Sequence, residues 1–566
     1  MKTSSICLFV LLLLTFSSVF GQKKTLVLGD TLESSISKGE QHTYQVWLES
    51  GQFVHITVEQ SGIDVAVTAV NPIGEKIVEL NAPTGIQATD HVEIEAKTSG
   101  NYQLDIYPFE SPADSGKYKI QVMELLSPAE YKQRLITERV QHEATIQALQ
   151  EHLQQNAIPI HHIEAGNDFN DLRLLKKILQ DVKIVGLGEA THGTREFFQF
   201  KHRLLEFLVT EMDFNAFALE SSYAACQPIN DYVLYGKGDR AAVLSGQGYI
   251  AWDTEEFSEM LDWLRSYNEG LPDAKKVRFY GVDLWNNDLG RKSIIAYLSK
   301  HDLNKVSAAD SIFQILSKLE PDWPMLLDDS DRKIMIDVLP RLQSLISHLA
   351  ANKDKYIAAS SPLEFDQNLQ YIKVMEQWIL ANTAEISERS KYMAENLMYL
   401  VDRSSPDEKF IIWQHNAHIR VDESDGYSKF GYMLRKQYSD QYYAFGFRFN
   451  EGSYQTRILN YGEAPGDLKV LTLPPAPVGS LEWYLSRTNI GNMILDFRIP
   501  SDNPAVEQFL NTPHQVQIAN WGYPMSSNYV DENPKKLYDG IIFIEKTTAT
   551  RPTAHAREAA EKRKRF

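Results

Sequence analysis

Short apolar runs that alternate with longer helical segments constrain the fold of this chain more than any other feature. After residue 157, six runs have the composition of buried strands, and helical periodicity fills the sequence between them: 183–187, 215–219, 277–282, 409–413, 442–447 and 541–544. Strands that alternate with helices are typical of a largely parallel sheet covered by helices. We therefore predict an α/β domain over residues 157–550. Between 303 and 403 no strand-like run occurs, which predicts a helical insertion into that domain.

Residues 23–126 show a different pattern, in which apolar and polar residues alternate. Val54, Ile56 and Val58 have polar neighbours, and turn residues separate this run from others of the same kind. Short alternating strands at this spacing predict an antiparallel β-sandwich. The pattern resembles the small β-sandwich modules that accompany secreted bacterial enzymes, which implies an accessory role in attachment, positioning or solubility. Residues 127–156 are predicted to form a long polar helix that links the sandwich to the α/β domain.

The first residues have the composition of a secretory signal peptide. Lys2 precedes an apolar run that continues to Leu14, and small residues follow, with Val19 and Gly21 at cleavage positions. We predict a signal peptide over residues 1–21 and an exported protein, periplasmic or extracellular. Its removal leaves Cys226 as the single cysteine, which excludes an internal disulfide. No later run is apolar enough to predict a membrane span, and residues 551–566 are predicted to form a basic C-terminal tail.

The overall charge narrows the choice of partners. The chain has 57 Lys and Arg residues against 75 Asp and Glu residues, a formal net charge of -18. Nucleic acids and anionic membrane surfaces both require a basic protein face, so neither is expected as the main partner. A small neutral or cationic molecule is the expected substrate, and the sequence leaves the oligomeric state open.

Titratable side chains follow four of the predicted strands at the point where each strand ends. In chain order they are Glu189 with His192, then Glu220, then Asp283, then His415 with His418. The carboxyl ends of parallel strands meet at the edge where open α/β sheets bind their ligands. Each residue by itself is compatible with a helix cap or a structural histidine. Their repetition at four strand ends predicts a single functional site.

The residue types at this site favour hydrolysis over phosphate binding. The turn GLGEATHG at residues 186–193 spaces its glycines as G-x-G-x-x-x-x-G, which does not match the dinucleotide motif, and Glu189 would repel a bound phosphate. An imidazole is suited to remove a proton from water, and Glu189 or Glu220 would fix its tautomer. A serine mechanism is disfavoured because G-x-S-x-G is absent from the sequence. Cys226 is expected to be a buried helix residue.

Several segments resemble the erythromycin esterase family, bacterial hydrolases that open macrolide lactones. The resemblance spans residues 163–548 and is carried by VGLGEATHGTREFFQFKHRLLEFLVTEMDFNAFALESSYA, FYGVDLW, ERSKYMAEN, IIWQHNAHI and YDGIIFIEK. It implies an α/β hydrolase domain in which His192 is the general base and Glu189 and Glu220 are the acidic partners. It further implies an active-site role for His415 and His418.

Two basic residues also fall on positions that this resemblance marks. Arg389 matches an active-site arginine of the family, although Ser390 stands where the family motif has Asp. Lys201 falls at a basic position of the first helix. His415, His418 or Arg389 would donate hydrogen bonds to the carbonyl oxygen as it gains charge.

We therefore predict a secreted hydrolase of carboxylic esters or lactones that uses a histidine-activated water and no cofactor, with macrolide lactones among the candidate substrates. Two alternatives stay open. The same Glu and His side chains could hold zinc or manganese, which would activate the water instead. A secreted binding protein could use the same cleft for a sugar or a polyketide. The helical insertion and the loop with Tyr249 and Trp252 would shape the pocket in each case.

Overall fold

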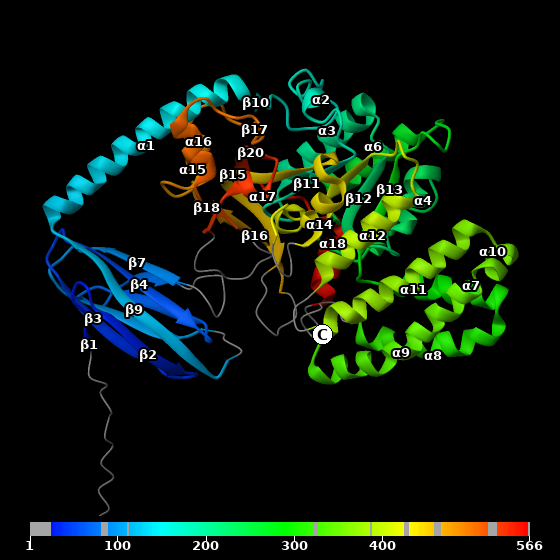
Figure 1. The fold of residues 1–566 in the computed structure, drawn as a ribbon, viewed down its shortest axis with the longest axis horizontal. Coiled ribbons are helices and arrows are strands. Elements are labelled where there is room, and N and C mark those ends of the chain that lie inside the picture. The colour runs from blue at the N-terminus through cyan, green and yellow to red at the C-terminus, as the bar shows by residue number, and fades with distance from the viewer. Residues whose placement is uncertain are drawn as a thin grey trace, which may run out of the picture. The chain divides into compact units, whose positions relative to one another are not determined.

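The computed structural model describes residues 24–80, 89–109, 113–320, 327–384, 388–423, 429–457, 466–518 and 529–563 of the chain. The signal peptide predicted over residues 1–21 lies outside these ranges. The chain divides into two compact units, of which the first runs to Arg139 and the second begins at Val140 (Figure 1). Within the described ranges, no helix combines the length and the apolar character that a bilayer crossing requires.

The first unit is a β-sandwich. One sheet has the order β1-β3-β8-β5-β6 and the other β2-β9-β4-β7. The strands are β1 Lys24–Thr25, β2 Thr31–Ser37, β3 His42–Leu48, β4 Phe53–Ser61, β5 Val65–Val70, β6 Lys76–Leu80, β7 Thr89–Glu95, β8 Gly100–Pro108 and β9 Ser115–Leu126. Val54, Ile56 and Val58 are fully buried between the sheets, as their alternation with polar residues predicts. The predicted all-β sandwich is confirmed.

A single long helix, α1 Pro128–Asn156, follows the sandwich. Ser127 caps its first turn, because its Oγ accepts the N–H of Glu130 at 3.3 Å while Oε2 of Glu130 accepts the N–H of Ser127 at 2.8 Å. The boundary between the two units falls inside this helix. Leu149 and Leu153 near its end are buried in the core of the second unit, so the end of α1 is part of that core.

The second unit is built on a nine-stranded sheet with the order β10-β17-β20-β15-β11-β14-β12-β13, in which β16 is added beside β15. The six strands from β20 to β13 are parallel to their neighbours in that run. The pairs of β17 with β10, of β17 with β20 and of β16 with β15 are antiparallel. The strands are β10 Ile158–Pro159, β11 Ile184–Leu187, β12 Ala216–Ser222, β13 Arg278–Asp283, β14 Phe410–Trp413, β15 Tyr442–Arg457, β16 Leu468–Leu473, β17 Met493–Asp496 and β20 Gly540–Thr547.

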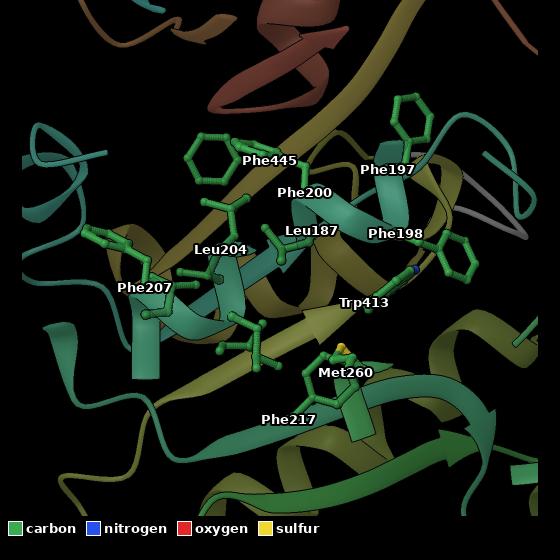
Figure 2. Close-up of a cluster of buried hydrophobic side chains, with 14 of the residues drawn as sticks. Leu187, Phe197, Phe198, Phe200, Leu204, Phe207, Phe217, Met260, Trp413 and Phe445 are labelled. Atoms are coloured by element: carbon green, nitrogen blue, oxygen red, sulfur yellow. The ribbon is translucent and has the colours of Figure 1, made fainter. Parts of the chain in front are cut away.

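Helices cover both faces of this sheet, which explains why its central strands are apolar throughout. On one face, α3 Arg195–Met212 and α6 Glu255–Asn268 pack on the sheet. Figure 2 shows this layer, in which Phe198 of α3 and Met260 of α6 lie near Trp413 of β14. On the other face, α12 Arg389–Arg403 and α14 Lys429–Tyr438 pack against residues such as Ile184 and Ile412. The predicted α/β fold with a largely parallel sheet is confirmed.

A group of helices stands apart from the sheet (Figure 1): α7 Asp288–His301, α8 Leu303–Leu319, α9 Asp329–Ala351, α10 Lys353–Ala359 and α11 Pro362–Thr383. Their shared core includes Leu298, Leu342 and Ile372. The same core contains Ala224, which follows β12, and Leu284, which follows β13. With α12, these helices account for the described part of the predicted insertion at 303–403, and they pack where β12 and β13 end.

Three strands of the sheet are not predicted by the sequence pattern. β10 and β17 are too short to stand out, and β16 is partly exposed, so its pattern resembles that of a loop. β15 extends to Arg457, well beyond the predicted end at 447, because β16 and β20 supply hydrogen-bonding partners for its polar half. Residues 551–563, predicted as a tail, include a helix, α18 Ala554–Arg563.

The remaining elements are short. The hairpin strands β18 His514–Gln517 and β19 Tyr529–Glu532 form a separate sheet. The other helices are α2 Leu175–Ile178, α4 Gln227–Tyr235, α5 Arg240–Gly246, α13 Asn416–Ile419, η3 Ser439–Gln441, α15 Leu481–Arg487, α16 Pro504–Asn511 and α17 Pro534–Leu537.

Candidate active site

The turn between β11 and α3 is held tightly by the chain around it. The carbonyl oxygen of Gly193 accepts the N–H groups of Gln455 and Thr550, each at 2.9 Å. A Cβ atom at Gly193 would lie 1.9 Å from the carbonyl oxygen of Gln455, and one at Gly188 would lie 2.2 Å from Oδ1 of Asn416. Both glycines are therefore required by close packing. The turn holds Glu189 and His192 at the carboxyl end of β11.

Glu189 is the fully buried centre of a hydrogen-bond cluster. Its Oε1 lies 2.5 Å from Nδ1 of His192. Its Oε2 accepts hydrogen bonds from Nζ of Lys201 and Nε1 of Trp413, both at 2.7 Å. Burial raises the pKa of Glu189, but the charge of Lys201 and the hydrogen bond with His192 outweigh burial and lower it overall. The ionised carboxylate can only accept, so Nδ1 of His192 carries its proton.

Lys201 provides the charge that balances Glu189. Its ammonium group lies 4.2 Å from the ring centre of Trp413 and 5.0 Å from that of Phe447. Burial lowers the pKa of Lys201 to about 8, although Glu189 acts in the opposite direction. The ion pair thus lies in an aromatic environment from which water is excluded.

Glu220, at the end of β12, joins three other predicted residues. Its Oε1 accepts Nη2 of Arg389 at 3.0 Å and lies 3.1 Å from Nε2 of His418. Its Oε2 accepts the N–H of His415 at 2.8 Å. Burial raises the pKa of Glu220, but His418 and Arg389 outweigh burial and hold it well below its usual range. Glu220 is therefore a buried carboxylate that stays ionised.

Asp283, at the end of β13, binds the other side of Arg389. Its Oδ1 accepts Nε of Arg389 at 2.9 Å, and its Oδ2 accepts Nη2 of the same side chain. The hydroxyl group of Tyr249 donates to Oδ2 at 2.8 Å. Burial would lower the pKa of Arg389, but Asp283, Tyr249 and Glu220 together raise it. The guanidinium group is fixed by two carboxylates from adjacent strands.

His415 is neutral and fixed in one tautomer. Its Nδ1 accepts the N–H of Ala417 at 3.2 Å, so the proton is on Nε2, which lies 3.3 Å from the carbonyl oxygen of Ala190. Burial, assisted by the nearby His192, lowers the pKa of His415 to about 3. The ring centres of His415 and His192 are 5.2 Å apart. His415 thus supports the turn that carries the first histidine.

His418 contacts Ser390, the residue that follows Arg389. Oγ of Ser390 lies 3.1 Å from Nδ1 of His418 and accepts the N–H of Phe430 at 3.2 Å. Since Oγ accepts from Phe430, its own proton is directed to Nδ1 of His418. Nε2 of His418 lies 3.1 Å from Oε1 of Glu220 and 3.3 Å from Nη1 of Arg389, so it meets an acceptor and a donor on the same side of the ring. The hydroxyl group of Ser390 favours the tautomer of His418 in which Nε2 carries the proton, and the contact with Arg389 favours the other.

All six residues predicted for the site come together in one cluster: Glu189, His192, Glu220, Arg389, His415 and His418. They meet because β11, β14, β12 and β13 are adjacent in the sheet. Lys201, expected only to support the site, is central to it. Trp252 is also part of it, since its Nε1 donates to the carbonyl oxygen of Glu220 at 3.0 Å and its ring centre lies 5.3 Å from that of His192.

Four further residues belong to the cluster: Asp283, predicted at a strand end but given no role, Tyr249, predicted to shape the pocket, and Ser390 and Trp413, to which the sequence assigned no function. The position of Asp283 at a strand end was a usable signal. Trp413 lies within an apolar strand, where its pattern indicates only core packing.

A pocket opens beside His192. Its walls come from the His192 turn, from the Ile250 loop, from the β15–β16 hairpin with Tyr454, and from the segment with Thr550 and Pro552. No carboxylate lines this pocket among the described residues. An uncharged group would therefore be accommodated next to the imidazole.

The described ranges contain no group of three or more His, Cys, Asp and Glu side chains arranged to hold a metal ion. The contacts give a physical reason, because Lys201 and Arg389 already neutralise the carboxylates of the cluster. Cys226 is buried, and burial raises the pKa of its thiol to about 12. It is therefore unsuited to act as a nucleophile.

Comparison with known proteins identifies the family of this chain. The family model described as erythromycin esterase matches residues 209–547, more than half of the chain. The chain belongs to the erythromycin esterase family. Erythromycin esterase type II of Escherichia coli is 25% identical over 71% of this chain and 98% of its own length. A putative hydrolase of Bacillus subtilis, YbfO, is 25% identical over 70% of this chain and 90% of its own length.

A solved structure shows the same fold. The crystal structure of a succinoglycan biosynthesis protein matches with a TM-score of 0.61 at 23% identity, over 73% of this chain and 99% of that one. Of the clustered residues, Glu220, Arg389, His415 and His418 lie inside the residues that the erythromycin esterase model matches, whereas Glu189, His192 and Lys201 precede them.

Proposed function

We propose that this protein is a hydrolase of carboxylic esters or lactones in which His192 activates the attacking water. One observation carries the proposal, the contact of 2.5 Å between Nδ1 of His192 and Oε1 of Glu189. Glu189 orients the imidazole and stabilises its charged form, while Lys201 and Trp413 hold Glu189 ionised. The arrangement has the geometry of a general base with an orienting carboxylate.

The reaction follows from this tautomer. With the proton of Nδ1 directed to Glu189, the lone pair of Nε2 takes a proton from water, and the oxygen of that water attacks the ester carbonyl carbon. The tetrahedral intermediate collapses by breaking the bond to the alcohol oxygen, which takes the proton back from His192. The products are a carboxylic acid and an alcohol, joined in one molecule when the substrate is a lactone.

Arg389 is our candidate for stabilising the oxyanion. Its Nε is bound by Asp283 and its Nη2 by Asp283 and Glu220, while Nη1, which lies 3.3 Å from Nε2 of His418, has a second N–H to offer the substrate. A guanidinium group held by buried carboxylates loses no freedom when negative charge develops on the substrate. His415 is less suited to this role than the sequence suggests, because its Nε2–H is directed to Ala190.

The expected substrate is a neutral ester or lactone. The pocket beside His192 is lined mainly by apolar and hydroxyl side chains, with Gln455 and Arg457 and without a carboxylate among the described residues, and the relative from Escherichia coli is named an erythromycin esterase. Macrolide lactones are accordingly the first substrates to test. The N-terminal sequence further leads us to propose that the protein is exported and acts outside the cytoplasm.

A hydrolysis screen tests the proposal. The purified protein is incubated with macrolides, simple lactones and acyl sugars, and products are identified by the mass gain of one water. We expect at least one class to be hydrolysed at a rate proportional to enzyme concentration. If no class is hydrolysed but one binds saturably, the protein is a binding protein and the hydrolase proposal is wrong.

Chelation distinguishes the two mechanisms for activating water. Exhaustive treatment with a chelator is expected to leave the hydrolysis rate unchanged, because cationic side chains already neutralise the buried carboxylates. Loss of activity that zinc or manganese restores would instead indicate a metal-bound hydroxide.

A further inference from the structure

The segment that follows β20, residues 548–555, crosses the site and is named here the C-terminal strap. The family model ends at residue 547, immediately before the strap begins. The N–H of Thr550 donates to the carbonyl oxygen of Gly193 at 2.9 Å, next to His192. The strap therefore contacts the turn that carries the proposed base.

The other end of the strap is anchored to the loop that contains Trp252. Nε of Arg551 donates to Oε1 of Glu256 at 2.8 Å, and the N–H of Arg551 donates to Oε2 at 3.1 Å. The hydroxyl group of Thr553 donates to Oδ1 of Asp253 at 2.6 Å. Both carboxylates are buried. These contacts fix the strap between the His192 turn and the loop that contacts Glu220.

Thr550 and Pro552 of the strap line the pocket beside His192. Opposite them are apolar side chains, among them Ile250, Ala251 and Leu468. No acidic residue of the described chain lines the pocket, and its polar members besides the threonines include His192, Gln455 and Arg457, whose Nε donates to the carbonyl oxygen of Gly466 at 2.8 Å. The apolar members of the lining suit an uncharged aliphatic group.

One hydroxyl group in this pocket differs from its neighbours. Oγ1 of Thr191 is hydrogen-bonded to Thr194, Oγ1 of Thr254 accepts the N–H of Phe257, and Oγ1 of Thr456 donates to a backbone carbonyl. Oγ1 of Thr550 has no hydrogen-bond partner among the described residues, although the residue is only 4% exposed. A buried hydroxyl without a partner costs stability unless a ligand or water satisfies it.

We propose that the C-terminal strap forms a substrate subsite beside His192, in which the hydroxyl group of Thr550 binds an oxygen atom of the substrate remote from the scissile carbonyl. The subsite takes a neutral aliphatic chain that carries a hydroxyl or carbonyl group, held between Pro552 and the apolar side chains opposite. This inference rests on the proposed hydrolysis at His192. The proposed subsite specifies the class of substrate for this hydrolysis, which is an ester or lactone whose chain carries a further oxygen atom.

The test compares pairs of esters that differ in one oxygen. p-Nitrophenyl esters of straight acids with four to eight carbons are measured beside their terminally hydroxylated counterparts, and the ratio of kcat/KM within each pair is recorded. Thr550→Val keeps the shape of the side chain and removes the hydroxyl group. We expect this ratio to fall about five-fold at the chain length that reaches Thr550, since one hydrogen bond is lost. Thr550→Ser retains the hydroxyl group and should keep the ratio of the unmodified protein.

Two further variants complete the design. Thr472→Val changes an exposed threonine of β16 outside the pocket and should leave every ratio unchanged. Ala251→Leu narrows the pocket opposite the strap and should raise KM for the eight-carbon ester at least five-fold relative to the four-carbon ester. Equal ratios in Thr550→Val and the unmodified protein at all chain lengths would overturn the subsite while leaving hydrolysis intact.

A binding measurement separates the subsite from the reaction. Amide analogues of the hydroxylated acids, which lack the labile ester, are titrated calorimetrically into the unmodified protein and Thr550→Val. A several-fold weaker affinity in the variant supports the subsite even if no ester is cleaved, in which case only the proposed reaction fails. Equal affinities, or no binding to either protein, overturn the subsite.

Discussion

The ammonium group of Lys201 lies 2.7 Å from Oε2 of Glu189, and neither side chain is exposed to solvent. Both charged side chains must be present for the folded protein to be stable, because removal of one leaves the other as a buried charge without compensation. The contact between Glu189 and His192 therefore depends on a lysine that is twelve residues away in the sequence, in the second turn of α3.

Replacing Lys201 with Met should destabilise the protein and impair the site together. We expect a loss of about 3–5 kcal/mol in the free energy of unfolding, because Glu189 becomes an unpaired buried carboxylate. The pKa of Glu189 should also rise, so that a proton competes with His192 for the carboxylate. Urea unfolding measures the first effect and the pH dependence of kcat the second. Lys391→Met removes a partly exposed ion pair with Glu388 and should cost less than about 1 kcal/mol.

Replacing His192 with Ala should abolish turnover without unfolding the protein. Loss of a general base lowers kcat by about 10²- to 10⁴-fold. The side chain is 14% exposed and does not fill the core, so the protein should stay folded, with a loss of about 1–3 kcal/mol because buried Glu189 loses one hydrogen-bond donor. His161→Ala, at an exposed histidine, serves as the control. A His192→Ala protein that keeps most of its activity would assign the base to another residue.

Buried His202 should make the protein sensitive to acid. Burial lowers its pKa to about 4 from the usual 6.5, and its Nε2 has no hydrogen-bond partner in the described structure. Between these two values the unfolded chain binds more protons than the folded protein, so stability falls as pH decreases from 6.5 to 4 and the loss stops below 4. The loss attributable to this residue is at most about 3 kcal/mol.

His202→Leu isolates this contribution. The difference in unfolding free energy between the variant and the unmodified protein should shift in favour of the variant as the pH is lowered from 7 to 4.5. His415, whose pKa burial lowers to about 3, contributes equally to both proteins and cancels. A difference that does not vary with pH would show that His202 titrates normally.

Ser390 should affect the reaction through His418. Ser390→Ala removes the hydroxyl group 3.1 Å from Nδ1 of His418 and also leaves the N–H of Phe430 without its acceptor. We expect a loss of about 1–3 kcal/mol in stability and a lower kcat. Ser390→Asp places a carboxylate beside Nδ1 of His418 and should fix a proton on that nitrogen, which the nitrogen chemical shifts of the imidazole would detect by NMR. Identical pH profiles of kcat in all three proteins would argue against tautomer selection by Ser390.

The position at which the chain is shortened should decide whether the second unit folds alone. The sequence pattern predicts that a chain beginning near Ala157 folds and hydrolyses small esters. Leu149 and Leu153, each 1% exposed, belong to the core of the second unit, so their removal should cost about 2–5 kcal/mol each. We expect a chain that begins at Val140 to be the more stable by thermal unfolding. Equal unfolding midpoints would show that α1 is dispensable for that core.

Much of this architecture can be predicted from local pattern. The alternation around Val54, Ile56 and Val58 is sufficient for the sandwich, because a strand with one buried face repeats every two residues. The apolar run before Glu189 and the one before Glu220 are sufficient for buried parallel strands. The polar residue that follows each of them points to a site, because the ends of parallel strands converge.

Only the tertiary structure decides which of these side chains touch and in which state of charge. The sequence does not indicate that β14 lies between β11 and β12. This strand order allows Trp413 to donate a hydrogen bond to Glu189 and His415 to donate one to Glu220. Nor does it indicate that the residues after β20 return to the His192 turn, since a basic C-terminal segment has the composition of a solvated tail. Contacts between distant segments and the exclusion of water set the ionisation of Glu189 and Lys201. Both arise from the folded arrangement of the whole unit, and neither is encoded in any one stretch of residues.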